Sequence, residues 1–333
     1  MTGRESHPSG EDDLIARYFK PLATDPGALG LVDDAAILKA QGEDIVVTTD
    51  AVVAGVHFLP DDPPDTVARK ALRVNLSDLA AKGATPAGFV LTLALQRADE
   101  SWLVAFARGL GEDAARYDCP LLGGDTVSTP GPLMVSITAF GRLPAGTMVR
   151  RSGASPGDCV MVTGTIGDAT LGLDLLRGGA VAAALADDVA SREVVVGRYR
   201  VPQPRNALAR AMRDHASAAM DVSDGLAGDL AKLCAASGVS ATIDLPRVPT
   251  SAVAAALLAR GVTGIEALIC GGDDYELLCT VAEAHCEGLA DAARSAGVAL
   301  TAIGRIVAEP GTPRFLDAQG RVIALARLSY SHF

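Results

Sequence analysis

The sequence predicts a two-domain α/β protein, and three observations lead to this prediction. The chain has 333 residues, which is about twice the length of an ordinary domain. Short apolar runs rich in β-branched residues alternate along it with longer segments of helical periodicity. A stretch rich in Gly, Pro and Ser at 150–158 separates two such regions, so we expect domains at 1–150 and 151–333.

The composition excludes several classes of protein. A net charge of -11 argues against a nucleic-acid partner, and an anionic substrate would need metal cations beside it. The six cysteines form no C-x-x-C pair, which is typical of buried thiols in a reducing compartment. The chain has no apolar run of membrane-spanning length and no secretory signal. We therefore expect a cytoplasmic protein with no membrane partner.

Taken in order, the first expected elements are a helix over 12–22 and an acidic turn. Pro21 ends the helix, and the turn at Asp33 and Asp34 precedes an apolar run. Two adjacent carboxylates repel each other unless a cation or a donor lies between them. The turn is therefore either a metal ligand or an exposed acidic loop.

The run 46–58 begins as a buried strand and continues into oxygen-bearing side chains. Thr48 and Asp50 share one face of the strand and Thr49 faces the other, because side chains alternate. A carboxylate flanked by hydroxyls at the end of a strand suits a hard cation. A polar turn followed by a surface His57 is the alternative.

A long helix follows, with Asp65 or Thr66 as the expected N-cap and Gly83 just past its C-terminus. Asp78 is unusual in a segment otherwise rich in Ala and Leu. The alternative to a functional role is a solvated stripe with a weak surface pair between Asp78 and Lys82.

The rest of the first half predicts a strand over 89–95, an amphipathic helix over 101–117 and a strand over 133–141. Between the last two, Gly124 and Asp125 lie in an expected turn after a short apolar run. The backbone amides of such a turn could face a phosphate, although a simple turn remains the alternative.

The second half opens with a strand over 159–163 and a glycine loop over 164–168 that leads into a helix over 169–176. Such a loop can receive phosphate at the helix N-terminus, but its spacing matches no known nucleotide motif. Strands are also expected over 300–303 and 314–316.

Two further acidic segments lie in this half. Asp221, Ser223 and Asp224 precede a helix running to about 235, and capping explains only one of their oxygens. The segment 270–278 combines paired glycines with three carboxylates. Ligands of α/β sheets lie at strand ends. Carboxylates gathered there suit several Mg²⁺ ions around a nucleotide, as phosphoryl transfer requires. We find neither a Ser-His-Asp arrangement nor a zinc motif.

Together these segments resemble the thiamine-monophosphate kinase family, in the superfamily of aminoimidazole ribonucleotide synthetase and selenophosphate synthetase. The matching segments span nearly the whole chain in the family's order: Asp33-Asp34-Ala35, Thr48-Thr49-Asp50, Gly55-Val56-His57-Phe58, Lys70-Ala71-Leu72, Asn75-Leu76-Ser77-Asp78-Leu79-Ala80-Ala81, Gly123-Gly124-Asp125-Thr126, Arg151-Ser152-Gly153-Ala154, Asp221-Val222-Ser223-Asp224-Gly225-Leu226 and Gly271-Gly272-Asp273-Asp274-Tyr275-Glu276-Leu277.

The resemblance implies a homodimer whose subunits have two domains of the aminoimidazole ribonucleotide synthetase-like fold, an α+β type with mixed sheets flanked by helices. It implies phosphorylation of thiamine monophosphate by ATP to give thiamine diphosphate, with several Mg²⁺ ions and with no acid–base or nucleophilic residue assigned. Three groups of residues are carried over by position: metal ligands Asp34, Thr48, Thr49, Asp50, Asp78, Asp125, Asp221 and Asp224; ATP contacts Gly124, Asp125, Arg151 and Ser223; and substrate contacts His57, Asp273 and Tyr330.

The chain departs from the family pattern at position 273, where Asp replaces the usual Glu and reaches about one methylene less. Two alternatives remain open. The chain could be a related ATP-dependent synthetase or cyclo-ligase, or a non-catalytic nucleotide-binding protein. The segment around His57 and the C-terminal Tyr330 favour the kinase over the first. Clustered carboxylates without a ligand only add repulsion, which argues against the second.

Overall fold

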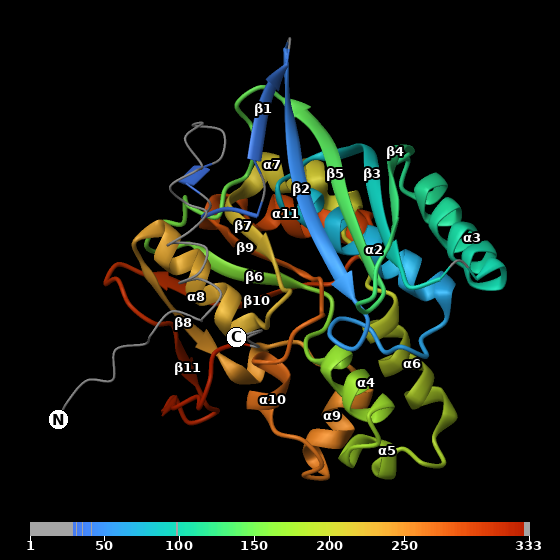
Figure 1. Ribbon diagram of the computed structural model, residues 1–333. Coiled ribbons are helices and arrows are strands. Elements are labelled where there is room, and N and C mark those ends of the chain that lie inside the picture. The colour runs from blue at the N-terminus through green and yellow to red at the C-terminus, as the bar shows by residue number, and fades with distance from the viewer. Residues whose placement is uncertain (1–28, 31, 35, 41, 98, 330–333) are drawn as a thin grey trace.

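The computed structural model describes residues 29–30, 32–34, 36–40, 42–97 and 99–329. The helix expected over 12–22 and Tyr330 lie outside these residues. In the described part of the chain, the strands form a five-stranded N-terminal sheet and a seven-stranded C-terminal sheet (Figure 1). Both sheets mix antiparallel with parallel pairs, so the prediction of an α/β protein with mixed sheets is confirmed. Among these residues, no helix has the length and apolar character needed to cross a membrane.

The N-terminal sheet has the strand order β1-β2-β5-β3-β4. Its strands and helices are β1 (Ala36–Ala40), β2 (Glu43–Val53), α2 (Pro64–Ala81), β3 (Thr85–Leu95), α3 (Glu100–Arg116), β4 (Leu121–Ser128) and β5 (Met134–Pro144). The expected end of β2 near Asp50 is wrong, because the strand runs on to Val53. It does so because Asp50 is paired with Ile137 in the antiparallel ladder with β5.

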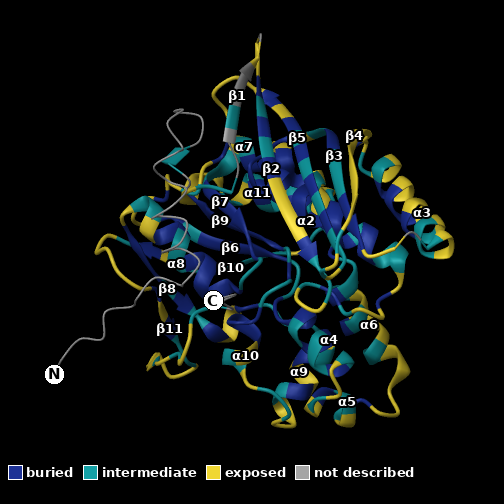
Figure 2. Ribbon diagram, viewed as in Figure 1, coloured by how far each residue is buried: buried dark blue, intermediate teal, exposed yellow. Residues whose placement is uncertain are grey.

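Helix α2 is buried between the N-terminal sheet and the second half of the molecule (Figures 1 and 2). Its expected start is wrong: the helix begins at Pro64, and Pro63 occupies the N-cap position without a side-chain cap. Proline suits the first helical turn, whose amides have no intrahelical partner. Its expected end is confirmed, since Gly83 follows the helix with a φ of 74°.

The expected turn at Gly124 and Asp125 is also wrong, because both residues lie inside β4. This strand forms the edge of the N-terminal sheet and is exposed along its whole length (Figure 2). It pairs in parallel with β3, with Leu91 opposite Gly124. A Cβ at position 124 would lie 1.9 Å from the Leu91 carbonyl oxygen, so close approach of the two strands explains this glycine.

The C-terminal sheet has the strand order β12-β11-β8-β10-β6-β9-β7. Its half of the chain contains β6 (Cys159–Thr163), α4 (Asp168–Leu176), α5 (Ala180–Ala184), α6 (Val189–Arg200), η4 (Asn206–Leu208), α7 (Ala209–His215), β7 (Ala216–Asp221), α8 (Leu226–Ser237), β8 (Ser240–Asp244), η5 (Leu245–Arg247), α9 (Ala252–Ala259), α10 (Ile265–Ile269), β9 (Leu277–Val281), α11 (Glu283–Ser295), β10 (Leu300–Val307), β11 (Arg314–Leu316) and β12 (Val322–Ile323).

Helices cover both faces of this sheet. In β6, Val160 and Val162 face a core that includes α8, and Met161 faces a core that includes α7, α11 and the end of α2. The alternation follows from the two-residue period of a strand. Helices α4, α5, α6 and α9 share a separate apolar cluster and lie together below the N-terminal sheet in Figure 1. The division of the chain at residue 150 stays a prediction, and the two sheets lie on either side of it.

Candidate active site

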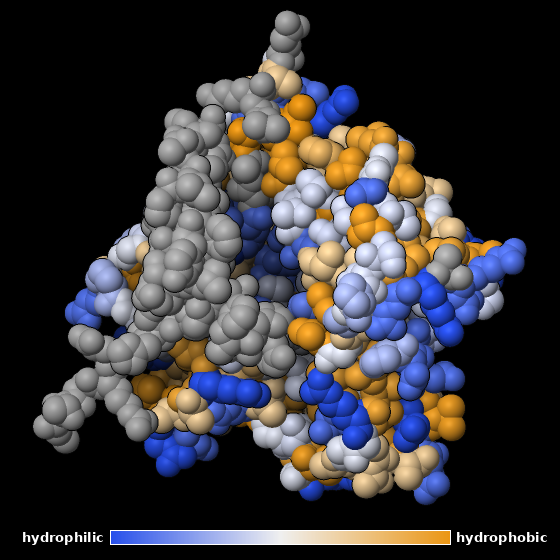
Figure 3. Space-filling view, viewed as in Figure 1, coloured by the Kyte–Doolittle hydropathy of each residue, from blue (hydrophilic) through white to orange (hydrophobic). Residues whose placement is uncertain are grey.

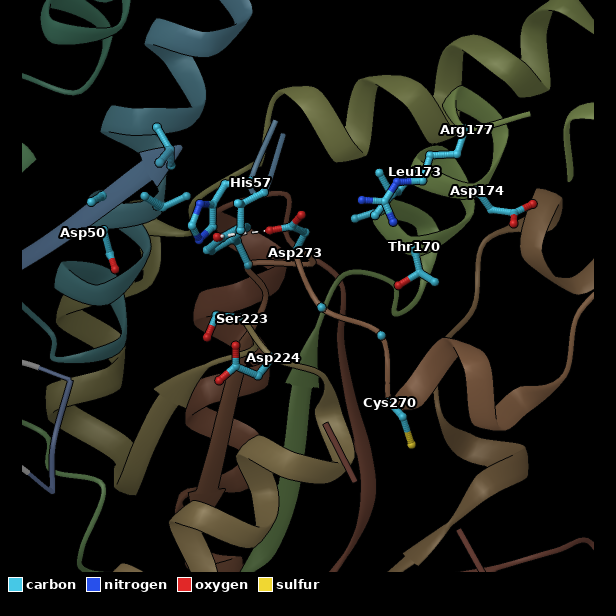
Figure 4. Close-up of a pocket in the computed structure, with 18 of the residues that line it drawn as sticks. Asp50, His57, Thr170, Leu173, Asp174, Arg177, Ser223, Asp224, Cys270 and Asp273 are labelled. Carbon is cyan, nitrogen blue, oxygen red and sulfur yellow. Dashed lines mark hydrogen bonds between the residues drawn. The ribbon is translucent and has the colours of Figure 1, made fainter. Parts of the chain in front are cut away.

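A pocket of about 650 Å³ lies where β2, α4 and the loops of the C-terminal half meet (Figure 4). Hydrophilic residues line part of a hollow near the centre of the face shown in Figure 3. Six of the predicted site residues line the pocket: Thr49, Asp50, His57, Ser223, Asp224 and Asp273. Helix α4 contributes the opposite wall with Thr170 and Leu173, and Arg177 follows directly after the helix.

Three predicted metal ligands come together beside this pocket. Asp34, Asp78 and Asp221 each offer a carboxylate oxygen, and these three atoms lie within 4.8 Å of one another. They belong to the segment before β1, to α2 and to the end of β7. The Thr48 hydroxyl donates to Asp78 Oδ2 at 2.5 Å and so joins the same group. We call these four residues the carboxylate cluster.

Burial and nearby negative charges raise the pKa of two members of the carboxylate cluster, Asp78 and Asp221. Burial raises the pKa of Asp221 to about 7, although the nearby Ser77 hydroxyl opposes the shift. Burial, followed by repulsion from Asp221 and Asp50, raises the pKa of Asp78 well above its usual value. An all-oxygen set of crowded carboxylates fits a hard divalent cation such as Mg²⁺, which would relieve that repulsion.

Two cations of the chain partly neutralise the cluster. Lys82 is fully buried, and its Nζ lies 2.7 Å from Asp33 Oδ1 and 3.1 Å from Asp34 Oδ2. The guanidinium of Arg151 pairs with Asp34, and the backbone amide of Arg151 donates to Asp33 Oδ2 at 2.8 Å. The interpretation of Asp78 and Lys82 as a solvated surface pair is therefore wrong. Because α2 is covered on both sides, these polar residues lie in the interior.

Asp50 extends the acidic wall into the pocket. Asp50 is exposed to solvent, although neighbouring protein atoms displace part of its hydration shell. This desolvation, together with repulsion from Asp224, raises the pKa of Asp50 to about 6. Thr49 faces the other way along the strand, and its hydroxyl hydrogen-bonds Ile137 O at 3.1 Å and Thr138 Oγ1 at 2.9 Å.

The turn at Ser223 and Asp224 is held by two residues that the sequence analysis did not single out. Asp229 accepts hydrogen bonds from the backbone amides of both turn residues, at 3.0 and 2.9 Å. Lys232 lies 2.5 Å from Asp224 Oδ2 and 3.3 Å from Asp229 Oδ1. The signal available in the sequence is their spacing, because Asp229 and Lys232 are three residues apart on α8 and face the turn together.

His57 and Asp273 lie on the same side of the pocket (Figure 4). The Val53 amide donates to His57 Nδ1 at 3.1 Å, which places the proton of a neutral ring on Nε2. Asp273 accepts from Lys70 Nζ at 3.0 Å and from the Tyr275 hydroxyl at 3.3 Å. The shorter Asp at position 273 therefore has two donors of its own.

The other carboxylates of segment 270–278 have structural roles. Asp274 is buried and accepts hydrogen bonds on both oxygens from the Gly167 amide, at 3.0 and 2.9 Å. Glu276 is buried between Arg198 and Arg205. The interpretation of the glycine loop 164–168 as a phosphate site is not supported, because the Asp274 carboxylate already accepts the hydrogen bond of the Gly167 amide.

Gly124 and Asp125 are not brought to the pocket. They lie on β4, and neither of them lines the cavity. Arg151 reaches the carboxylate cluster through Asp34. Tyr330 lies outside the described residues, but Arg327, three positions earlier, lines the pocket.

Comparison with known proteins places this arrangement in a family. The model of the AIR synthase related protein, N-terminal domain, matches residues 32–143, and that of its C-terminal domain matches residues 155–316. The chain is 47% identical to the thiamine-monophosphate kinase of Caulobacter vibrioides, over 98% of this chain and 91% of the relative. It is 41% identical to that of Escherichia coli (strain K12), over 97% and 98% of the two chains.

Solved structures agree with the sequence relatives. A thiamine-monophosphate kinase from Stenotrophomonas maltophilia K279a is 40% identical, with a TM-score of 0.77 over 91% of this chain and 94% of that one. A structure of AaThiL complexed with AMPPCP and TMP has a TM-score of 0.83, with 27% identity and full coverage of both chains. Escherichia coli HypE, a hydrogenase maturation protein, shares the fold at 19% identity and a TM-score of 0.71. The chain therefore belongs to the AIR synthase related family and, within it, to the thiamine-monophosphate kinases.

Proposed function

We propose that this chain transfers the γ-phosphoryl group of ATP to thiamine monophosphate, giving thiamine diphosphate and ADP, with Mg²⁺ as the metal. The observation that carries the proposal is the pocket itself. Asp50 of the N-terminal half and Asp224 of the C-terminal half line it together with His57 and Asp273. A family member with this fold is described in complex with AMPPCP and TMP, which supports the same pair of substrates here.

The proposal assigns roles to residues in both halves of the chain, with 1–150 and 151–333 as the two domains. The proposed metal ligands are Asp34, Thr48, Thr49, Asp50, Asp78, Asp125, Asp221 and Asp224. Gly124, Asp125, Arg151 and Ser223 would contact ATP, and His57, Asp273 and Tyr330 would contact thiamine monophosphate. The crowded oxygens of the carboxylate cluster support the assignment of Asp34, Thr48, Asp78 and Asp221 as metal ligands.

The chemistry requires positioning and charge neutralisation more than proton transfer. The attacking oxygen belongs to a substrate phosphate that is already anionic at neutral pH, so it needs no strong general base. Bound Mg²⁺ would neutralise charge that develops on the transferred phosphoryl group. Asp229 fixes the turn that presents Ser223 and Asp224. Asp273, an anion held by Lys70, suits the positively charged thiazolium ring of the substrate.

We also propose that the protein is a cytoplasmic homodimer. Strand β4 supports the dimer, because Leu121, Leu122 and Val127 are exposed on this unpaired sheet edge. The six cysteines, all free in the structure, support a reducing compartment. Sedimentation analysis of the wild-type chain and of Leu122→Lys checks the dimer. We expect the wild-type chain to sediment as a dimer and the lysine charge of Leu122→Lys to shift the variant toward monomer.

One assay tests the proposed reaction. Purified protein is incubated with ATP, Mg²⁺ and thiamine monophosphate, and thiamine diphosphate is followed directly by chromatography. We expect turnover that needs all three components and stops with EDTA. An aminoimidazole precursor is offered in a parallel reaction. Formation of ADP with that precursor but not with thiamine monophosphate would indicate a related synthetase, and no turnover with either would indicate a binding protein.

A further inference from the structure

Lys70 is a buried cation that the metal, ATP and substrate assignments leave unused. It lies in the middle of α2, and its side chain is 2% exposed. Its Nζ donates to the His57 carbonyl oxygen at 2.7 Å and to Asp273 Oδ2 at 3.0 Å. The ammonium also lies 3.9 Å from the centre of the Tyr199 ring. These contacts account for the three donor directions of the group.

The cost of burying Lys70 points to a role beyond stability. An ammonium group loses its hydration when buried, and an ion pair in the interior often recovers little more than that loss. An apolar side chain of similar length would avoid the cost. Unlike an apolar side chain, the ammonium donates two directional hydrogen bonds, and these fix the relative positions of the two groups that accept them.

Those two groups come from different halves of the chain. His57 follows β2 of the N-terminal sheet, whereas Asp273 precedes β9 of the C-terminal sheet. Both line the pocket on the same side (Figure 4). Tyr199, from α6, also donates its hydroxyl to the His57 carbonyl, at 3.3 Å. Lys70 therefore connects the two proposed substrate contacts through a single atom.

The segment that carries Asp273 needs such support. Asp273 has a φ of 70° and Tyr275 has a φ of 50°, a region that residues with a Cβ seldom adopt. The Asp273 amide donates to the Ser223 carbonyl and the Tyr275 amide to the Val222 carbonyl, both at 2.8 Å, which fixes the main chain. The side chain of Asp273 is 24% exposed, so Lys70 and Tyr275 decide which way its carboxylate points.

We propose that Lys70 is a positioning residue that holds the His57 segment and the Asp273 carboxylate in the geometry that binds thiamine monophosphate. This inference rests on the proposed function and names the residue that sets substrate affinity at the same site. The contacts of Lys70 are with His57, Asp273 and Tyr199, and none of these residues is assigned to the metal or to ATP. Loss of Lys70 therefore changes the binding of the acceptor and leaves the binding of ATP intact.

The test compares Lys70→Met with a matched control, Arg69→Met. Arg69 is the preceding cation on α2 and pairs with Glu112 and Asp113, neither of which lines the pocket. We expect Lys70→Met to raise KM and the calorimetric Kd for thiamine monophosphate by at least about tenfold, as misplaced contacts do. KM for ATP should stay within about twofold. Arg69→Met should change neither value.

Measurements on the wild-type protein distinguish a failure of the proposed function from a failure of the proposed role of Lys70. A wild-type protein that neither binds nor phosphorylates thiamine monophosphate would contradict the proposed function. A functional wild type with unchanged acceptor affinity in Lys70→Met, or with equal losses for both substrates, would overturn the role of Lys70. If Lys70→Met does not fold, Lys70→Gln is measured in the same way. Failure of both to fold, beside a folded Arg69→Met, would assign Lys70 to stability and also overturn the proposal.

Discussion

Asp34 and Asp221 hold carboxylate oxygens within 4.8 Å of each other, although one precedes the first strand of the N-terminal sheet and the other ends β7 of the C-terminal sheet. The third carboxylate, that of Asp78, lies on the helix between the two sheets. Lys82 and Arg151 neutralise part of this charge through Asp34, and the repulsion that is left opposes the contact between the halves. A bound divalent cation would turn the same residues into a link between them.

We therefore expect Mg²⁺ to stabilise the protein in the absence of nucleotide. A ligand that binds only the folded state at about 100 times its Kd adds roughly 2.7 kcal/mol. For a chain of this size, that energy corresponds to a rise of several degrees in the thermal midpoint. Differential scanning fluorimetry with and without Mg²⁺ measures it. Asp221→Asn should abolish the rise, whereas the exposed control Asp214→Asn should keep it. An equal rise in Asp221→Asn would contradict the metal assignment.

The stability of the metal-free protein should depend on pH in a defined direction. The folded-state pKa is raised to about 7 for Asp221 and to about 6 for Asp229, in both cases mainly by burial. The unfolded value for Asp is about 3.9. The folded state thus binds these protons more tightly, so their contribution is complete below about pH 4 and is lost as the pH rises through 6 and 7.

In EDTA, the thermal midpoint should consequently fall between pH 5 and pH 8. Saturating Mg²⁺ should make the fall smaller, because the cation replaces the protons as the partner of the carboxylates. The measurement is a series of thermal melts across this range at constant ionic strength. A midpoint that rises with pH in EDTA would show that ion pairs formed by other carboxylates outweigh this group.

Asp50→Asn separates catalysis from folding. Loss of hydration and the Asp224 charge raise the pKa of Asp50 to about 6, so the metal-free folded state ionises this carboxylate less readily than the unfolded chain does. The amide should leave the metal-free thermal midpoint unchanged or higher, while turnover falls by about two orders of magnitude or more. Asp224→Asn should lose similar activity but also some stability, because it loses the contact with Lys232. Normal turnover in folded Asp50→Asn would show that Asp50 has no role in the reaction.

Local patterns were enough to predict several elements of the fold. Helix α3 was expected over 101–117 and spans Glu100–Arg116, because its amphipathic period is local and the Asp99 side chain caps it through the Trp102 amide. Strand β6 was expected at its observed bounds, Cys159–Thr163. In both cases the residues that decide the structure lie within the element or next to it.

The errors arose where distant parts of the chain decide the structure. The segment with Gly124 and Asp125 is a strand because it pairs with β3, which no local turn propensity reveals. Asp78 and Lys82 are interior residues because α2 is covered from both sides. The ordinary spacing of Lys70 on that helix likewise conceals its contact with Asp273, a residue of the other half.

Transfer should be direct, with inversion at phosphorus. The substrate phosphate supplies the attacking oxygen, and the proposed mechanism assigns no side chain as a covalent carrier of the phosphoryl group. The experiment uses ATP that is chiral at the γ-phosphorus and determines the configuration of the terminal phosphate of thiamine diphosphate. A single displacement inverts that centre. Retention would show two successive displacements and would direct attention to a pocket nucleophile such as His57.

Tyr330 is expected to contact the thiazolium ring of thiamine monophosphate. The residue lies near the C-terminus of a chain in which only 4% of residues are aromatic, and Arg327, three positions earlier, lines the pocket. A tyrosine face attracts a cationic ring with about 0.5–2 kcal/mol, which corresponds to roughly 2- to 30-fold in affinity. Tyr330→Ala should raise KM for thiamine monophosphate within that range and leave KM for ATP nearly unchanged. Tyr330→Phe should be mild, because the ring face supplies the contact. Steady-state kinetics of both variants decide the matter, and an equal rise for both substrates would assign Tyr330 a structural role only.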